Sequence, residues 1–150
     1  MSIFTIFDAL EAKIKANTAF EDFNFFRFES EANSNQQSLG SVPFVKVWWS
    51  QNSSLLSEYP YKIISDCDFS AEMRWNLEKS DTSAIEKIRE YSLYDKAFKE
   101  CLMPDEDCIL GMESVLSCRV ISRPGEIAGA SALKHGRILV DVTIQYIENF

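Results

Sequence analysis

The stretch DFSAEMRWNLE, from Asp68 to Glu78, has the clearest periodicity in this sequence. Its odd positions, from Phe69 to Leu77, carry apolar side chains, and its even positions carry polar or charged ones. Alternation with a period of two is typical of a β-strand that has one buried face and one solvated face. We therefore predict a strand here, with the odd residues on the core and the even residues in water.

Outward from this strand, four more segments have the composition or the alternation of strands: 20–28, 43–49, 112–122 and 138–146. Segment 43–49 has Val45, Val47 and Trp49 on one face and Phe44, Lys46 and Trp48 on the other. Segment 112–122 has Leu116, Cys118 and Val120 opposed to Val115, Arg119 and Ile121. Three polar segments, 29–41, 51–59 and 123–136, are predicted to be loops because they have little to bury.

Two segments have the apolar spacing of amphipathic helices. The first runs from Ser2, which can cap its N-terminus, to Asn17, which can end it. The second runs from Ser83 to Leu102 and opens with the capping-box pair of Ser83 and Glu86. We expect one helix near the N-terminus and one after the long central strand.

This order of elements has no regular alternation of strand, helix and strand, which argues against a parallel doubly wound sheet. We predict an α+β fold: a single domain over residues 1–150, with a mostly antiparallel sheet and the two amphipathic helices packed on one face. The other face of the sheet is expected to be polar and solvated.

The formal net charge is −8, from 23 acidic and 15 basic side chains. An acidic chain repels nucleic-acid phosphates unless a basic stripe overcomes the repulsion, and the sequence has no such stripe. No stretch approaches the roughly 18 apolar residues that span a bilayer, and residues 1–10 do not have the basic start of a signal peptide. We therefore expect neither specific nucleic-acid binding, nor membrane insertion, nor export by a cleaved signal.

Residues that could carry chemistry are few. The four cysteines have no CxxC spacing, so we expect free thiols in a reducing compartment rather than a zinc site. The single histidine, His135, has no serine or cysteine placed near it by the sequence, which favours a loop histidine over a catalytic one. Neither RPGEIAG at 123–129 nor PDED at 104–107 has the spacing of a nucleotide or calcium loop. We predict no catalytic residue, no cofactor and no metal ion.

The layout resembles that of the tail terminator or tail completion proteins of long-tailed bacteriophages and of related neck proteins. The resemblance covers nearly the whole chain and is one of architecture, because the family has few invariant motifs. It rests on IFDALEAKI, VPFVKVWW, FSAEMRWNLEK followed by TSAIEKIREYSLYDKAFKECL, and the closing HGRILVDVTIQYIE. The phenylalanine-rich segment 20–28 and the polar segment 29–41 depart from the family pattern, which leaves the position within the neck open.

The resemblance implies a subunit that assembles as a hexameric ring, caps the tail tube and faces the neck of the virion, after assembly in the host cytoplasm. The implied partners are further copies of the chain, the tail tube protein and the neck or connector proteins, while DNA passes without specific binding. The ring interface is expected to include Trp48, Phe44, Arg123, Glu126, Lys134 and Arg137.

Several alternatives stay open. Trp48 either anchors the interface or completes the core beneath segment 51–59. The protein could be another head-to-tail connector or stopper, or a non-viral cytosolic module that binds a peptide at a sheet edge or near Trp48. A small hydrolase or transferase is a third class, in which changing His135 would abolish turnover.

Overall fold

The computed structural model describes residues 3–28, 42–57, 62–77, 84–103, 112, 115–125 and 135–148. Its elements are α1 (Ile3–Ala16), the short 3-10 helix η1 (Thr18–Phe20), β1 (Asn24–Phe28), β2 (Phe44–Ser57), β3 (Lys62–Asn76), α3 (Ala84–Leu102), β4 (Val115–Pro124) and β5 (His135–Glu148). The strands form one sheet in the order β1-β2-β3-β5-β4. The β1–β2 pair is parallel and the other pairs are antiparallel, which confirms the predicted α+β fold.

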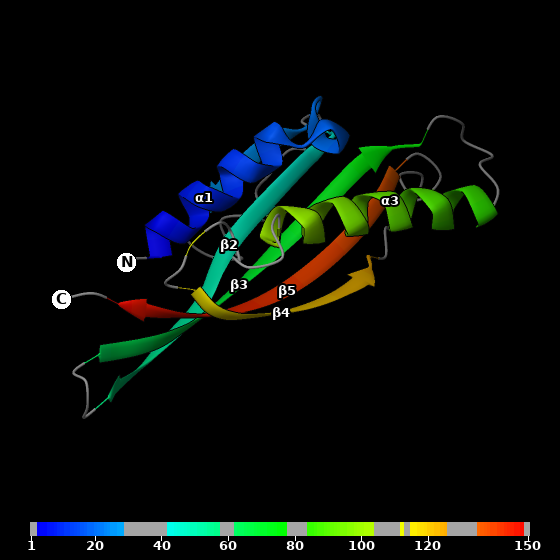
Figure 1. Cartoon of the computed structure of the whole chain (residues 1–150). Coiled ribbons are helices and arrows are strands. Elements are labelled where there is room, and N and C mark those ends of the chain that lie inside the picture. Colours follow the sequence, from blue (N-terminus) through cyan, green and yellow to red (C-terminus); the bar gives the residue numbers. More distant parts are fainter. Residues whose placement is uncertain are drawn as a thin grey trace.

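Both helices lie on the same side of the sheet, with α1 alongside β2 and α3 over β3 and β5 (Figure 1). Apolar side chains from α1, such as Leu10, and from α3, such as Phe98, are buried in one core with the facing side chains of the sheet. The two helices also meet directly, because the Cys101 thiol of α3 donates a hydrogen bond of 3.6 Å to the backbone oxygen of Lys13 in α1. The predicted packing of two amphipathic helices on one face is therefore confirmed.

The central strand β3 has the predicted register. The predicted core positions from Phe69 to Trp75 are buried, and Leu77 is partly buried against the core, as expected. Of the even positions only Asn76 is exposed, whereas Asp68, Ser70 and Arg74 are partly buried and Glu72 is buried, so the expectation of a fully solvated face is wrong for most of them. The buried positions pair with buried positions of β5, for example Phe69 with Val142. The alternation of the sequence therefore identifies the core face of both strands.

Three expectations about element bounds are wrong. Residues 51–57, expected in a loop, belong to β2, because their backbone pairs with β3 even though their side chains are mostly polar. In segment 20–28 the strand starts only at Asn24, because Asn17 caps the 3-10 helix by accepting a hydrogen bond of 2.9 Å from the Ala19 backbone N–H. The expected loop 123–136 is shorter, since β4 extends to Pro124 and β5 starts at His135.

The predicted faces of β4 also need a correction. A register shift between Val115 and Ser117 inserts one extra residue opposite β5. Val115 is consequently buried in the core on the same side as Cys118, and Leu116 is exposed. The sequence alternation, which placed Val115 opposite Cys118, fails because a bulge reverses the faces on its two sides.

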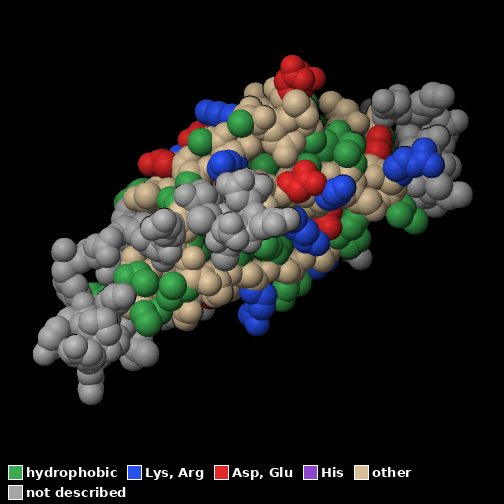
Figure 2. All heavy atoms as spheres, viewed as in Figure 1, with side chains coloured by type: hydrophobic (Ala, Val, Ile, Leu, Met, Phe, Trp, Pro, Cys, Tyr) green, Lys and Arg blue, Asp and Glu red, His purple; other side chains and the backbone are tan. Residues whose placement is uncertain are grey.

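The surface over the helices carries charges of both signs, intermixed with apolar side chains (Figure 2). None of the helices in the described ranges is both long and apolar enough to cross a bilayer.

Candidate subunit interface on the second face of the sheet

The sheet has a second face, on the side opposite α1 and α3. The register places on it Phe26 and Phe28 of β1, Phe44, Lys46 and Trp48 of β2, Ser70, Glu72 and Arg74 of β3, Arg137, Leu139 and Asp141 of β5, and Arg119, Ile121 and Arg123 of β4. Four of the predicted interface residues, Phe44, Trp48, Arg123 and Arg137, therefore share this face although they come from three strands. The other two, Glu126 and Lys134, lie outside the described residues.

Glu72 is the centre of a buried ionic network on this face. Its carboxylate lies 3.3 Å from the Lys46 ammonium, 3.3 Å from the Arg74 guanidinium and 2.9 Å from Nε of Arg137. Glu72 is only 3% exposed and Lys46 only 5%. The expectation that the even positions of β3 face water is therefore wrong at Glu72. One carboxylate satisfied by cations from three strands can stay charged without water, and the long side chains around it exclude the solvent.

The burial of this network affects the electrostatics of its members. Burial lowers the pKa of Arg74 from its ordinary value, and the nearby carboxylate of Glu72 opposes that shift. Arginine stays charged throughout because its ordinary pKa is far above neutrality. Arg74 therefore contributes a fixed positive charge to this network.

Aromatic rings border the network on the side of β1 and β2. The Lys46 ammonium lies 5.5 Å from the centre of the Phe44 ring and 5.8 Å from that of Trp48, within the range of cation–π attraction. Phe26 stacks on Phe28 and meets the Phe44 ring edge-on. Phe26 and Phe28 remain half-buried, so an apolar partner could still contact them.

Trp48 itself is 7% exposed and Phe44 is fully buried within the single subunit. This burial favours the interpretation in which Trp48 belongs to the subunit's own structure. The covering segment proposed from the sequence is wrong, however, because residues 51–57 continue β2 itself. A neighbouring subunit would contact this face mainly at residues that are more exposed than Trp48 and Phe44.

A polar cavity of about 260 Å³ opens on the same face, and it is lined by Trp48, Ser70, Glu72, Arg123, Arg137 and Asp141 among others. The Arg123 guanidinium contacts Asp141 at 3.0 Å, and the Ser70 hydroxyl donates a hydrogen bond of 2.8 Å to the same carboxylate. The fold therefore brings three of the predicted interface residues, Trp48, Arg123 and Arg137, to one place. The arrangement suits recognition of complementary charges.

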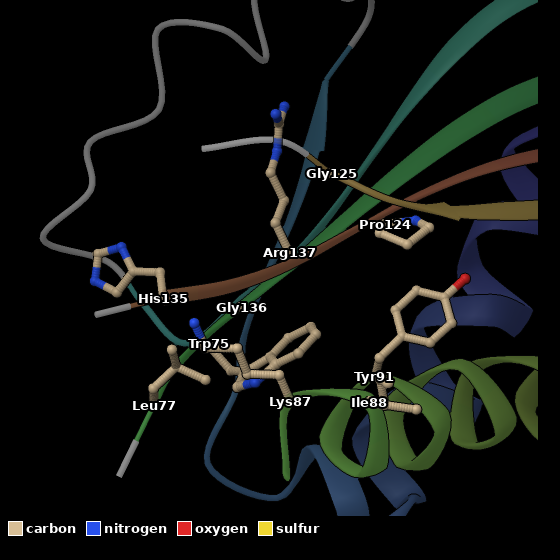
Figure 3. Close-up of a pocket in the computed structure, with 10 residues that line it drawn as sticks. All are labelled: Trp75, Leu77, Lys87, Ile88, Tyr91, Pro124, Gly125, His135, Gly136 and Arg137. Carbon is tan, nitrogen blue, oxygen red and sulfur yellow. The ribbon is translucent and has the colours of Figure 1, made fainter. Parts of the chain in front are cut away.

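A second cavity, of about 310 Å³, was not predicted from the sequence. It is lined by Trp75, Leu77, Ile88, Tyr91, Pro124 and Gly136, with Lys87, Gly125, His135 and Arg137 completing the wall (Figure 3). The side chain of Arg137 points away from α3 in this view, toward the second face (Figure 3). The lining is mostly apolar, which suits a hydrophobic side chain of a partner.

The floor of this second cavity depends on a glycine. Gly136 pairs directly with Trp75 across the strands, and a Cβ at Gly136 would lie 2.2 Å from the indole ring. The indole N–H of Trp75 donates to the carboxylate of Glu90 at 3.3 Å, which fixes the ring under α3. The sequence points to this cavity only through Gly136, which follows His135. The sequence alone does not show that Gly136 lies opposite Trp75 in the sheet.

Nothing in the described ranges resembles a metal centre, since no three His, Cys, Asp or Glu side chains gather there in a metal-binding arrangement. Burial raises the pKa of the Cys67 thiol to about 12 and those of Cys101 and Cys118 to about 11. Thiols with such values are poor nucleophiles at neutral pH.

Comparison with known proteins does not identify the chain: no family model matches the sequence, and no curated protein is significantly similar to it.

Proposed function

We propose that this protein is a structural virion protein of a long-tailed bacteriophage, a tail-terminator-like subunit. In this proposal about six copies form a ring that caps the tail tube and connects it to the neck. The observation that carries the proposal is the second face of the sheet. It combines a buried ionic network, half-buried phenylalanines and a polar cavity, while both described helices pack on the opposite side. A ring subunit needs such a rigid body with a separate, chemically mixed surface for its neighbours.

The length of the central strands supports the same role. β1 ends at Phe28, which pairs with Trp48, but β2 continues to Ser57 against β3. The β2–β3 hairpin therefore extends beyond the helices at one end of the molecule (Figure 1). An arm of this kind can reach a neighbouring subunit or the tube below the ring.

The charge of the chain fits a channel through which DNA passes. A net charge of −8 repels phosphates, so DNA would move through the ring without being held. The proposed partners are other copies of the chain, the tail tube protein and the neck proteins, and the proposed location is the virion after assembly in the host cytoplasm. The proposed role is structural and not catalytic.

The ring can be tested with the purified protein by native mass spectrometry and negative-stain electron microscopy at tens of micromolar. We expect one closed species with the mass of about six chains and a central hole. A protein that stays monomeric at these concentrations, or that forms open filaments, would contradict the proposal.

A second function, peptide binding, is favoured by the apolar cavity beneath α3. Its aromatic lining and its volume suit an apolar side chain of an extended peptide. In that case the protein would stay monomeric, and Ile88→Glu at the cavity rim would weaken the binding of a peptide with an apolar anchor. Ring formation that Ile88→Glu leaves intact would favour the virion role.

A further inference from the structure

The two edge strands of the sheet are β1, with five residues, and β4, with ten. β4 forms one edge, and it exposes the large apolar side chains of Leu116 and Ile121. Edge strands are usually protected from pairing with other chains by lysines, prolines or bulges. In β4 the bulge lies at the start and the proline at the end, so neither interrupts residues 117–123, whose charged side chains are Arg119 and Arg123. Among the described residues, no strand pairs with the outer edge of β4. Such an edge is suited to accept another strand.

We propose that β4 of one copy pairs with β1 of the next copy, so that the sheets of neighbouring subunits continue into one another. This inference rests on the proposed ring and identifies its interface. β5 runs parallel to β1, and β4 runs antiparallel to both. Rotation about an axis along the strands preserves strand direction, so the neighbour's β1 would meet β4 antiparallel. The contact joins two different edges, as a closed ring requires.

The pattern of side chains selects a register for this pairing. Residues directly opposite each other in a sheet share one face, so Ile121, on the second face, must oppose a second-face residue of β1. If it opposes Phe26, then Arg119 opposes Phe28 and Arg123 opposes Asn24. Ile121, which is 53% exposed in the subunit, would then be covered by the stacked rings of Phe26 and Phe28.

The charges of the two edges are complementary in the same register. β4 exposes Arg119 and Arg123, whereas the turn before β1 exposes Glu21 and Asp22. Glu21 and Asp22 precede β1 in the chain, so this register brings Arg123, opposite Asn24, to their end of the strand. Pairing of β4 with itself around Ile121 would instead set Arg119 directly against Arg123, which is unfavourable. The occupant of the β4 edge is therefore the β1 edge of a second copy.

A first test compares the same substitution at two apolar residues of similar exposure, one at the proposed β4–β1 contact, called the seam, and one far from it. Ile121→Glu places a charge in the proposed seam, and Leu93→Glu places one on α3, where the side chain is equally exposed at 54%. In sedimentation velocity we expect Ile121→Glu to sediment as a monomer with an unchanged melting temperature, and Leu93→Glu to assemble like the original protein. Normal assembly of Ile121→Glu would overturn the proposal.

A second test identifies the partner edge by disulfide trapping. Asn24→Cys and Arg123→Cys are made in separate chains, and oxidised glutathione is added to each chain alone and to the mixture, with the original protein and its four cysteines as the control. Directly opposite residues of antiparallel strands have Cα atoms about 4.5–5.5 Å apart, which a disulfide can span. We expect a cross-linked dimer only in the mixture. A dimer from Arg123→Cys alone would show that two β4 edges pair in a register centred on residue 123, and rings without any cross-link would place the interface elsewhere. Either result overturns the seam but leaves the ring, whereas a chain that never assembles contradicts the proposed function as well.

Discussion

The carboxylate of Glu72 accepts two hydrogen bonds from the guanidinium of Arg137, one of 2.9 Å from Nε and one of 3.3 Å from Nη2. The two residues belong to paired strands and lie diagonally across them. Removing one partner of a buried ion pair costs about 3–5 kcal/mol, because the other charge stays buried. We therefore expect Glu72→Gln to lower the free energy of unfolding by about 3 kcal/mol, measured by urea denaturation.

A matched control is available on the same face. Asp141 pairs with Arg123 at 3.0 Å, but both side chains are more than half exposed. Exposed ion pairs contribute only about 0.2–1 kcal/mol, so Asp141→Asn should have a small effect. Equal losses from the two variants would mean that the Glu72 network is solvated.

Trp48 and Trp49 provide a comparison between adjacent residues of one type. Trp48 is 7% exposed, whereas Trp49 is 40% exposed. Truncating a buried large aromatic side chain typically costs about 3–5 kcal/mol, so Trp48→Ser should strongly lower the stability of the isolated subunit, and Trp49→Ser much less. Thermal melting under conditions that keep the chain monomeric distinguishes the roles. An unchanged melting temperature for Trp48→Ser, combined with loss of assembly, would make Trp48 an interface anchor instead.

Gly136→Ala tests how tightly the floor of the apolar cavity is packed. Its new methyl group would overlap the indole ring of Trp75, which is buried and cannot withdraw. Overpacking of this kind costs about 1–3 kcal/mol, to be measured by chemical denaturation. Gly125→Ala is a second tight position and not a neutral control, because a Cβ there would lie 2.6 Å from Cγ and Cδ of Arg137, whose guanidinium is held by Glu72. An unchanged free energy of unfolding for Gly136→Ala would be inconsistent with this packing.

The ion pair between Glu11 of α1 and Arg27 of β1 should stabilise the fold in a way that depends on pH. Burial alone would raise the pKa of Glu11, but hydrogen bonds from Lys15 and Arg27 outweigh it and lower the pKa below its ordinary value of 4.5. The stabilisation is therefore fully present above about pH 4.5 and is lost as the pH falls through the lower folded value. We expect Glu11→Gln to be less stable than the original protein by under about 1 kcal/mol near pH 7, with the difference vanishing in acid. A difference that persists below the folded pKa would exclude the ionic cause.

Much of the fold follows from periodicity, because β3 and β5 are central strands with one apolar face. Their alternation, from Phe69 to Trp75 and from Ile138 to Tyr146, identifies which residues the helices cover. The polar half of β2 could not be predicted in this way. There, pairing with β3, as between Ser54 and Ser65, supplies backbone hydrogen bonds that side-chain composition does not reveal.

The candidate interface depends on information that no single segment carries. Lys46, Glu72 and Arg137 come from three strands, and only the order and register of those strands bring them together. The bulge near Val115 is likewise invisible to a pattern with fixed period, since one inserted residue reverses the faces. The predicted residues Arg123 and Arg137 do share a cavity with Trp48, but their common face became evident only from the sheet.

The central claim, that the protein ends tail growth by closing a ring, is tested most directly by electron microscopy of particles assembled with and without its gene. We predict tails of defined length when the gene is present and overlong, headless tails when it is absent, because without the ring nothing stops addition at the end of the tube. Tails of normal length that are detached from filled heads would contradict this and indicate a joining protein. Intact particles of normal appearance would contradict any role in the neck.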